Sequence, residues 1–442
     1  MKSICLFFQV HQPFRHRGYR FFDIGNDNYY YDDYANETIM REVAQKSYLP
    51  TNKLLLKLAD RLEGKFKVSF SITGLALEQF GLYAPEVIES FQKLAKTGCV
   101  EFLSETYSHS LSSLKDKDIF EKQVQLHDQR IFELFGHKPN VFRNTEMIYS
   151  DEIGAQIADM GYKAILTEGA KHILGWKSPN FVYVNAINPR LKVLMRNFKL
   201  SDDISFRFSN TNWSEYPLTP EKFVRWLENK NSKEEVVNLF LSYESFGERQ
   251  VKESGIFDFL EKFPQIIIED NKLKFATPSE VIDELQPISA VSVPHPISWA
   301  DEERDLTAWL GNEMQKEAFD KLYKLKHRME KCTDPKLNKD WNYLQVSDHF
   351  YYMSTKFFSD GDVHQSFNPF DSPYDAFINY MNVLSDFKIR LNSFVPENEI
   401  EHEIAALHKI IDEKEVKIRK LEADLIRVRK GKRENLRQRK IT

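Results

Sequence analysis

The feature that most constrains the fold of this chain is a regular alternation of short apolar stretches and amphipathic helical stretches over residues 1–290. Short apolar runs, and runs that alternate apolar and polar side chains, are typical of strands, whereas apolar residues spaced by three or four are typical of helices. The stretches with strand character are 4–10, 66–73, 100–103, the run that ends just before Glu146, 162–166, 181–184, 191–196, 237–243 and 273–276. Strands that are joined through helices run parallel, and a series this long favours a closed parallel α/β barrel over an open sheet.

A change in composition predicts where this α/β region ends. Past about Val291 the sequence becomes helix-rich and aromatic. We therefore expect a barrel over 1–290 and a helical subdomain over 291–395 that completes a cleft. The remaining segment, 396–442, carries apolar residues at the a and d positions of a heptad repeat. They are Ile404, Leu407, Ile411, Ile418, Leu421, Leu425 and Val428, with Lys414 as the one polar d residue.

This heptad pattern predicts a C-terminal coiled coil over about 400–430, which is a candidate for joining two copies of the chain as a homodimer. The alternative is that the same apolar stripe packs back onto the chain's own helical subdomain. A basic end follows the repeat. A run of this kind is usually a solvated helix face and not a nucleic-acid site.

The overall composition disfavours several partners and locations. The 61 basic and 66 acidic side chains leave a net charge of -5, which argues against nucleic acid as a partner. The three cysteines, Cys5, Cys99 and Cys332, have no metal-binding spacing, which is typical of a reducing compartment. Neither a signal-peptide core nor an apolar run of about 18 residues occurs. We therefore expect a soluble, cytoplasmic protein with no membrane partner.

Polar side chains follow several of the predicted strands, and Glu146 is the most prominent of them. It comes directly after an apolar run and just before Ser150, which can open the next helix. In alternating β/α chains the carboxyl ends of the strands carry the active site, because the loops there converge around one substrate. The same reasoning places His11, Glu105 and His109 at that rim. Taken singly, each of them could instead be a salt-bridge or hydrogen-bond partner without a functional role.

Five short segments, in their order and relative spacing, resemble the pattern of glycoside hydrolase family 57, of the α-amylase type. They are His11-Gln12-Pro13, 98–102, 142–149, 239–248 and 304–312, and the segments 196–203 and 216–220 support them. The resemblance covers roughly residues 1–390. It implies a (β/α)7 barrel with a helical subdomain, retaining chemistry on an α-glucan or maltooligosaccharide, and no required metal or other cofactor.

The resemblance also implies roles for individual residues. Glu146 takes the position of the nucleophile, and His11 that of a residue lining the first glucose subsite. The position of the family's general acid, an aspartate, is occupied by Ser242. A serine hydroxyl is too weak an acid to protonate a glycosidic oxygen at neutral pH, and losing general-acid help costs about 10²–10⁴-fold in rate. Glu244, which shares a face with Ser242 if the strand continues to it, is either a substitute acid or a structural or subsite residue. The remaining candidates for substrate binding are Glu105, His109, Arg196, Asp203, Tyr243 and Trp309.

Three functions compete. The first is an α-glucan hydrolase or transglycosylase, and the second is a non-catalytic α-glucan-binding relative that kept the cleft and lost the acid. Ser242 is the feature that divides these two. The third is a metal-dependent carbohydrate deacetylase, which needs an Asp and two His ligands at short spacing. The sequence disfavours the third function, because it contains no His-x-x-x-His motif and no Asp-Asp pair directly after the first strand.

Overall fold

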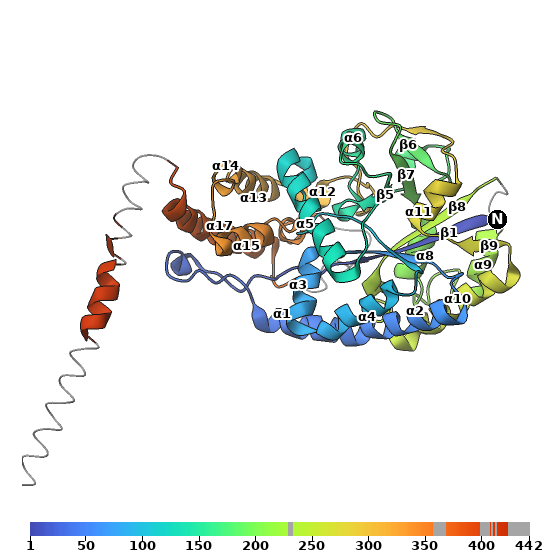
Figure 1. The fold of residues 1–442 in the computed structure, drawn as a ribbon, viewed down its shortest axis with the longest axis horizontal. Helices are drawn as coiled ribbons and strands as arrows, with labels where there is room; N and C mark the ends of the chain where they lie inside the picture. The colour runs from blue at the N-terminus through green and yellow to red at the C-terminus, as the bar shows by residue number, and fades with distance from the viewer. Residues whose placement is uncertain (229–232, 357–367, 398–406, 408–409, 412, 423–442) are drawn as a thin grey trace, which may run out of the picture.

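The computed structural model describes residues 1–228, 233–356, 368–397, 407, 410–411 and 413–422. The strands of this part of the chain form two five-stranded sheets (Figure 1). The first sheet has the order β3-β2-β1-β8, with β9 beside the start of β1, and all of its neighbouring strands are parallel. Its strands are β1 (Lys2–Val10), β2 (Val68–Ile72), β3 (Val100–Phe102), β8 (Val236–Ser242) and β9 (Leu273–Phe275).

The second sheet has the order β10-β6-β7-β5-β4. Its strands are β4 (Val141–Arg143), β5 (Ala164–Glu168), β6 (Tyr183–Asn185), β7 (Lys192–Arg196) and β10 (Ser289–Val291). The neighbours β4, β5 and β7 are parallel, but β6 is antiparallel to β7. The connection between β6 and β7 holds no helix, and a link this short allows only an antiparallel pair. The expectation of an all-parallel series is therefore wrong for 181–184, and β10 is a strand that the sequence pattern does not predict.

Hydrogen bonds join the two sheets at two places. Ser104, just past β3, forms a parallel bridge with Phe142 of β4 and donates its N–H to the carbonyl of Val141 at 3.0 Å. Asn197, just past β7, donates its N–H to the carbonyl of Asn238 in β8 at 2.9 Å. The strand β9, which lies within the predicted stretch 273–276, pairs with the first residues of β1, while β8 lies along the other edge of β1.

Helices follow most of the strands of the two sheets. They are α1 (Asp33–Val43), α2 (Leu49–Arg61), α3 (Gly74–Tyr83), α4 (Pro85–Ala95), α5 (Lys117–Phe135), α6 (Asp151–Asp159), α7 (Lys171–Leu174), α8 (Phe198–Ser205), α9 (Pro220–Glu228), α10 (Ile256–Asp270) and α11 (Pro278–Glu284). The strands are so well covered that all five residues of β2 are buried, although its sequence alternates apolar and polar side chains. The predicted helix start at Ser150 is confirmed, because its hydroxyl accepts a hydrogen bond from the N–H of Ile153.

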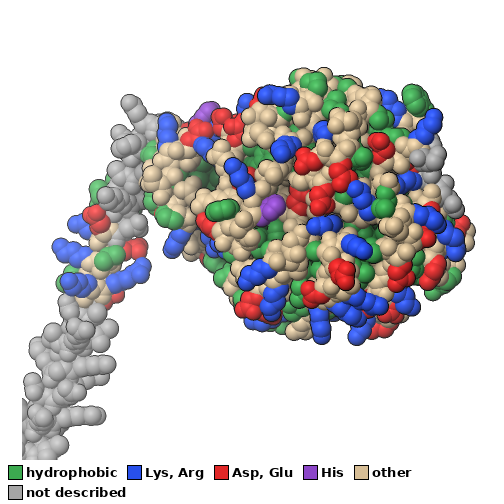
Figure 2. All heavy atoms as spheres, turned by 45° about the vertical axis from the view of Figure 1, so that its right-hand side comes forward, with side chains coloured by type: hydrophobic (Ala, Val, Ile, Leu, Met, Phe, Trp, Pro, Cys, Tyr) green, Lys and Arg blue, Asp and Glu red, His purple; other side chains and the backbone are tan. Residues whose placement is uncertain are grey.

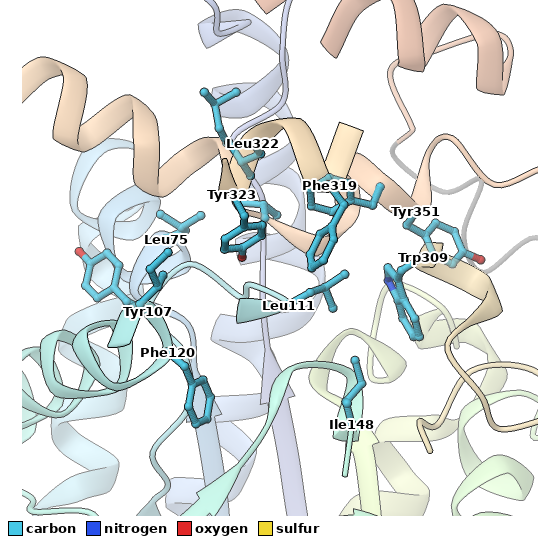
Figure 3. Close-up of a cluster of buried hydrophobic side chains, with 14 of the residues drawn as sticks. Leu75, Tyr107, Leu111, Phe120, Ile148, Trp309, Phe319, Leu322, Tyr323 and Tyr351 are labelled. Atoms are coloured by element: carbon cyan, nitrogen blue, oxygen red, sulfur yellow. The ribbon is translucent and has the colours of Figure 1, made fainter. Parts of the chain in front are cut away.

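A second group of helices follows the strands. They are α12 (Thr307–Leu310), α13 (Glu313–Tyr323), α14 (Lys326–Met329), α15 (Pro335–Leu344), α16 (Ser347–Tyr351) and α17 (Pro373–Phe394). The helix-rich character expected past Val291 is thus present, while the domain boundaries stay a prediction. Figure 3 shows side chains of this group meeting side chains of the strand region in one buried cluster. Its labelled members are Leu75, Tyr107, Leu111, Phe120, Ile148, Trp309, Phe319, Leu322, Tyr323 and Tyr351.

Much of the C-terminal tail lies outside the described residues, including Ile404 and Leu425 of the predicted heptad seam. The described residues 413–422 are helical and exposed. Two seam residues within the described set, Ile411 and Ile418, are 52% and 53% exposed, so nothing in the described part of the same chain covers them. The coiled coil stays a prediction. Among the described residues, no helix is both long enough and apolar enough to cross a membrane.

Candidate active site

Glu146 lies at the carboxyl end of β4, in a 3-10 turn over Thr145–Met147. Its backbone has φ 54° and ψ 24°, in the left-handed region, which costs on the order of 1–2 kcal/mol for a residue with a side chain. The segment that follows β10 holds this conformation in place. Trp299 donates its backbone N–H to the carbonyl of Glu146 at 3.2 Å, and Ile297 forms an antiparallel bridge with Tyr149.

Three side chains orient the carboxylate of Glu146. The indole Nε1 of Trp299 donates to Oε2 at 2.6 Å, and Nε2 of His109 lies 3.0 Å from Oε1. The hydroxyl of Ser347 also donates to Oε1, at 3.4 Å. Each carboxylate oxygen therefore has a donor, and the orientation of the group is fixed by the protein alone.

The surrounding charges keep Glu146 ionised. Burial would raise the pKa of this carboxyl group, but the hydrogen bond from His109 and the charges of His109 and Arg143 outweigh burial and lower the pKa to about 2. His109 is protonated at neutral pH, because its hydrogen bonds to Glu105 and Glu146 overcome the effect of burial and raise its pKa to about 9. Arg143 lies 3.5 Å from Glu105 and completes a row of alternating charges. A carboxylate held ionised and oriented in this way suits nucleophilic attack.

His11, just past the end of β1, connects the strand rim to helix α16. Its Nδ1 lies 2.9 Å from the hydroxyl of Thr73, and its Nε2 lies 2.9 Å from Oδ2 of Asp348. The ring of His11 stacks on that of His109, with the centroids 4.0 Å apart. Burial and the positive charge of His109 lower the pKa of His11. His11 is therefore neutral at pH 7 and donates one N–H to Asp348.

The carboxyl end of β8 brings Ser242 and Glu244 to the same site. The hydroxyl of Ser242 donates to Oε2 of Glu244 at 2.5 Å. The hydroxyl of Tyr48 donates to Oε1 of Glu244, also at 2.5 Å. Glu244 therefore accepts a hydrogen bond through each of its carboxyl oxygens.

An ion-pair network adjoins Glu146 on the side of β7. Arg196, at the end of β7, lies 2.5 Å from Asp202, and Arg304 lies 3.5 Å from the same carboxylate. The ring of Trp299 has two guanidinium groups over it, that of Arg143 at 5.3 Å and that of Arg196 at 5.8 Å. In the described part of the chain, no group of three or more His, Cys, Asp or Glu side chains is arranged to hold a metal ion.

Many of these side chains line one cavity of about 590 Å³, a size that is usual for small-molecule sites. The predicted candidates that line it are His11, His109, Glu146, Arg196, Ser242 and Glu244. Figure 2 shows one face of the molecule, on which acidic side chains and a histidine gather near the centre. The cavity therefore brings together residues from the carboxyl ends of five strands, β1, β3, β4, β7 and β8.

Glu105 and Asp203 do not line the cavity. Glu105 is fully buried and reaches the site only through His109, whose Nδ1 lies 3.4 Å from its Oε2. Asp203 is buried and pairs with Arg207 at 2.5 Å. Glu105 thus positions His109. The buried positions of Glu105 and Asp203 do not favour direct contact of either side chain with a substrate.

Tyr243 and Trp309 also lie away from the cavity wall. Tyr243 is fully buried and donates its hydroxyl to Asn52 at 2.5 Å. Trp309 is 1% exposed and packs against Tyr351 in the buried cluster of Figure 3. Tyr243 lies in the 3-10 turn over Tyr243–Ser245 that follows β8, and its ring packs into the core against Phe8 and Phe70. Helix α12 turns Trp309 into the core, so its position favours a packing role over the substrate binding for which it was a candidate.

Three side chains of the site carry no signal in the strand and helix pattern. Trp299 contacts Glu146 from 153 residues further along the chain, and Ser347 from 201 residues further along. Asp348 stands beside Ser347 at the start of α16 and contacts His11. A polar residue in an irregular segment or in the first turn of a helix resembles any surface residue in sequence. Only the fold reveals that these three face Glu146 and His11.

Parallel strands with connecting helices, and an ionised carboxylate at their carboxyl ends, define an α/β protein of the kind that includes many glycoside hydrolases. Residues 5–294 match the family model of Glycosyl hydrolase family 57, which is more than half of the chain. The chain belongs to this family, and the resemblance seen in its motifs is confirmed.

Named relatives agree with this membership. The chain is 42% identical over 407 residues to a protein of Methanocaldococcus jannaschii named "Putative alpha-amylase", with 89% of this chain and 86% of the relative covered. It is similar in structure to a family 57 branching enzyme from Thermococcus kodakaraensis, with a TM-score of 0.64, 13% identity, and 91% of this chain and 94% of that chain covered. It is also similar to the 4-alpha-glucanotransferase from Thermococcus litoralis, with a TM-score of 0.58 and 17% identity. That match covers 79% of this chain and 56% of the glucanotransferase. These two structures confirm the expected α/β fold.

Proposed function

We propose that the protein is a retaining glycoside hydrolase or transglycosylase of the α-amylase type that acts on α-1,4-glucans. The observation that carries the proposal is the state of Glu146, whose carboxylate is kept ionised by His109 and oriented by Trp299 at the cavity wall. Membership of Glycosyl hydrolase family 57 and the names of the relatives support the substrate class. The proposed ligand is accordingly an α-glucan or a maltooligosaccharide.

In a retaining reaction one carboxylate attacks the anomeric carbon, and a second group protonates the leaving oxygen. We assign the first role to Glu146. His109 is protonated and in contact with Glu146. It stabilises the negative charge of the Glu146 carboxylate in the free enzyme, and again when this carboxylate is released from the sugar in the second step. His11 and Arg196 line the same cavity and are proposed to contact sugar hydroxyl groups there.

We further propose that seven strands close into a barrel, in the order β1-β2-β3-β4-β5-β7-β8 and back to β1. The parallel bridge at Ser104 and the hydrogen bond from Asn197 to Asn238 support this closure, as does the pairing of β8 with β1. A barrel gathers the carboxyl ends of all its strands at one rim. It accounts for the common cavity of His11, Glu146 and Ser242.

Within this scheme, residues 1–290 form the barrel, 291–395 the helical subdomain that completes the cleft, and 396–442 a tail that pairs two copies of the chain. The exposed apolar side chains of Ile411 and Ile418 support the pairing, since a helix that shows such a stripe gains most of its stability by burying it.

The second candidate function is a non-catalytic α-glucan-binding protein, and the observation in its favour is Ser242. This serine stands at the end of β8 and lines the cavity, at the position where the family resemblance places the general acid. A hydroxyl group cannot replace a carboxyl group as a proton donor at neutral pH. If no other group takes over that task, the cavity binds a glucan without cleaving it.

One experiment separates the two functions. The purified protein and its Glu146→Gln variant are incubated with maltoheptaose and with glycogen, and products and binding are followed in the same samples. We expect the parent to form products, and the variant to bind with nearly unchanged affinity but to form none, because the amide keeps the shape and loses the charge. Binding by the parent without any product would favour the second function. A variant as active as the parent would show that Glu146 is not the nucleophile.

A further inference from the structure

Retaining chemistry requires a second acidic group that carries a proton when the substrate binds. Five acidic side chains line the cavity within the described residues, namely Glu146, Asp202, Glu244, Glu248 and Asp348. Asp202 is ion-paired with Arg196 at 2.5 Å and with Arg304 at 3.5 Å. Asp348 accepts the N–H of His11 at 2.9 Å. Both groups are thus placed as charged acceptors, and neither is suited to donate a proton.

Glu244 and Glu248 remain as candidates, and their surroundings differ. Glu244 accepts hydroxyl hydrogen bonds at both oxygens, from Ser242 and from Tyr48. Such an arrangement suits a carboxylate that accepts, and not an acid that donates. In Glu248, by contrast, Oε2 is buried and has no hydrogen-bond partner among the described residues. A buried carboxyl oxygen without a donor is tolerated better in a neutral group than in a charged one.

The charges around Glu248 support the neutral form. Burial raises the pKa of Glu248, the charge of Lys46 lowers it, and the charges of Glu42 and Glu244 raise it again, with a net shift upward. Glu42 and Lys46 stand on the helical segment packed against the turn after β8, and Glu244 stands on that turn itself. Of the five acidic groups of the cavity, Glu248 is therefore the one whose environment combines a lack of donors with a raised pKa.

A tight turn after β8 fixes the position of Glu248. Arg249 donates its N–H to the carbonyl of Glu244 at 2.9 Å, which folds the chain back after the strand. Gly247 has φ 99°, and a Cβ at this position would come within 1.9 Å of the carbonyl oxygen of Lys46. Only glycine fits such a place. The turn is therefore packed tightly against the neighbouring helix, and it holds the side chain of Glu248 at the cavity wall.

We propose that Glu248 is the proton donor of this cavity and performs the task that a carboxyl group at position 242 would otherwise perform. This inference rests on the proposed function, because it requires Glu146 to be the nucleophile. Glu146 forms a bond to the anomeric carbon while the glycosidic C–O bond breaks, and the electron pair of that bond stays with the leaving oxygen, which takes the proton of Glu248. In the second step, water or a sugar hydroxyl gives its proton to the Glu248 carboxylate. The oxygen of that water or hydroxyl displaces Glu146 from the anomeric carbon, and both groups are restored.

Two substrates with different leaving groups test the proposal on the full-length protein. Cleavage of maltoheptaose requires a proton on the leaving oxygen, whereas fluoride leaves α-maltosyl fluoride without one. We expect Glu248→Gln to lower kcat/KM for maltoheptaose by about 10²–10⁴-fold and to leave kcat/KM for the fluoride within a few-fold of the parent. In the same variant the maltoheptaose profile should lose the decline caused by Glu248 and keep only the decline near pH 9 that follows the titration of His109. Glu244→Gln is the matched control, and we expect it to change kcat/KM for both substrates to a similar degree.

Several results would overturn the proposal. One is that Glu248→Gln, with thermal unfolding that matches that of the parent, loses kcat/KM equally for both substrates or loses it for neither. Another is a loss of kcat/KM in Glu244→Gln that is confined to maltoheptaose, which would make Glu244 the proton donor. Failure of the proposed function has a different signature, because Glu146→Gln would then turn over α-maltosyl fluoride as fast as the parent does.

Discussion

The substitution Trp299→Phe tests how the charge of Glu146 is maintained. The indole Nε1 of Trp299 donates to Oε2 of Glu146 at 2.6 Å, and the ring lies under the guanidinium groups of Arg143 and Arg196. Phenylalanine keeps an aromatic ring but removes the N–H group together with one ring of the indole. The substitution therefore removes the hydrogen bond to the carboxylate along with part of the ring surface.

The magnitude follows from the charge on the acceptor. A hydrogen bond to a charged group contributes about 1.5–3 kcal/mol, and about 1.4 kcal/mol corresponds to one pKa unit. Loss of the bond therefore raises the pKa of Glu146 by about one to two units, from its value of about 2. The ionised form is still dominant at pH 7. The variant is therefore expected to lose activity mainly at acidic pH, where the parent is still active.

The assay is the pH dependence of kcat/KM with α-maltosyl fluoride, because its acid limb reports the nucleophile in the free enzyme. We expect the acid limb of Trp299→Phe to lie about one to two pH units above that of the parent. Trp309→Phe is the control, since Trp309 is equally aromatic, is buried in the core and does not line the cavity. Identical acid limbs for the parent and Trp299→Phe would refute the reasoning, as would an equal shift in Trp309→Phe.

Three further changes test other parts of the account. Ser242→Asp should raise kcat/KM on maltoheptaose, because it places a carboxyl group at the end of β8; a folded, glucan-binding variant without any gain would contradict the match of this position to the family acid. The pKa of His109 rises from 6.5 to about 9 on folding, so its contribution to stability is complete below pH 6.5 and is lost as the pH rises through 9. Over that window, urea denaturation should show the free energy of unfolding of the parent falling by on the order of 3 kcal/mol more than that of His109→Gln. Parallel curves of unfolding free energy against pH for the two proteins would contradict the charged pair of His109 and Glu146. Light scattering should give a dimer for the full chain and a monomer for a chain ending at Pro396, whereas equal monomer masses would leave the tail as an intramolecular brace.

The strands could be predicted because burial on both faces leaves a local signal. The predicted runs 4–10 and 237–243 are strands in the structure, as β1 and β8, with bounds that differ by one or two residues. The pattern of apolar runs does not record the direction of β6, but the chain length does, because the segment 185–190 between the two expected strands is too short for a parallel crossover. The pairing of 273–276 depends on packing in three dimensions, since β9 pairs with the start of β1 while β8 lies along the other edge of β1.

The site could be predicted only where the chain topology forces residues together. His11, Glu146 and Ser242 each follow a parallel strand, and parallel strands deliver their carboxyl ends to one side. Trp299 and Asp348 reach Glu146 and His11 from segments whose positions depend on the packing of the helical group. No local pattern records such long-range packing, so their place at the site becomes visible only in three dimensions.

Trapping the glycosyl-enzyme intermediate tests the central claim most directly, because it identifies the atom that attacks the sugar. The parent protein is incubated with 5-fluoro-α-glucosyl fluoride, which forms the intermediate without needing a proton donor and releases it slowly. Proteolysis and mass spectrometry then locate the label. We predict a single labelled carboxylate, Glu146, in the peptide that contains the β4 rim. A label on Glu244, Glu248 or Asp348, or steady release of fluoride without any labelled peptide, would contradict the account.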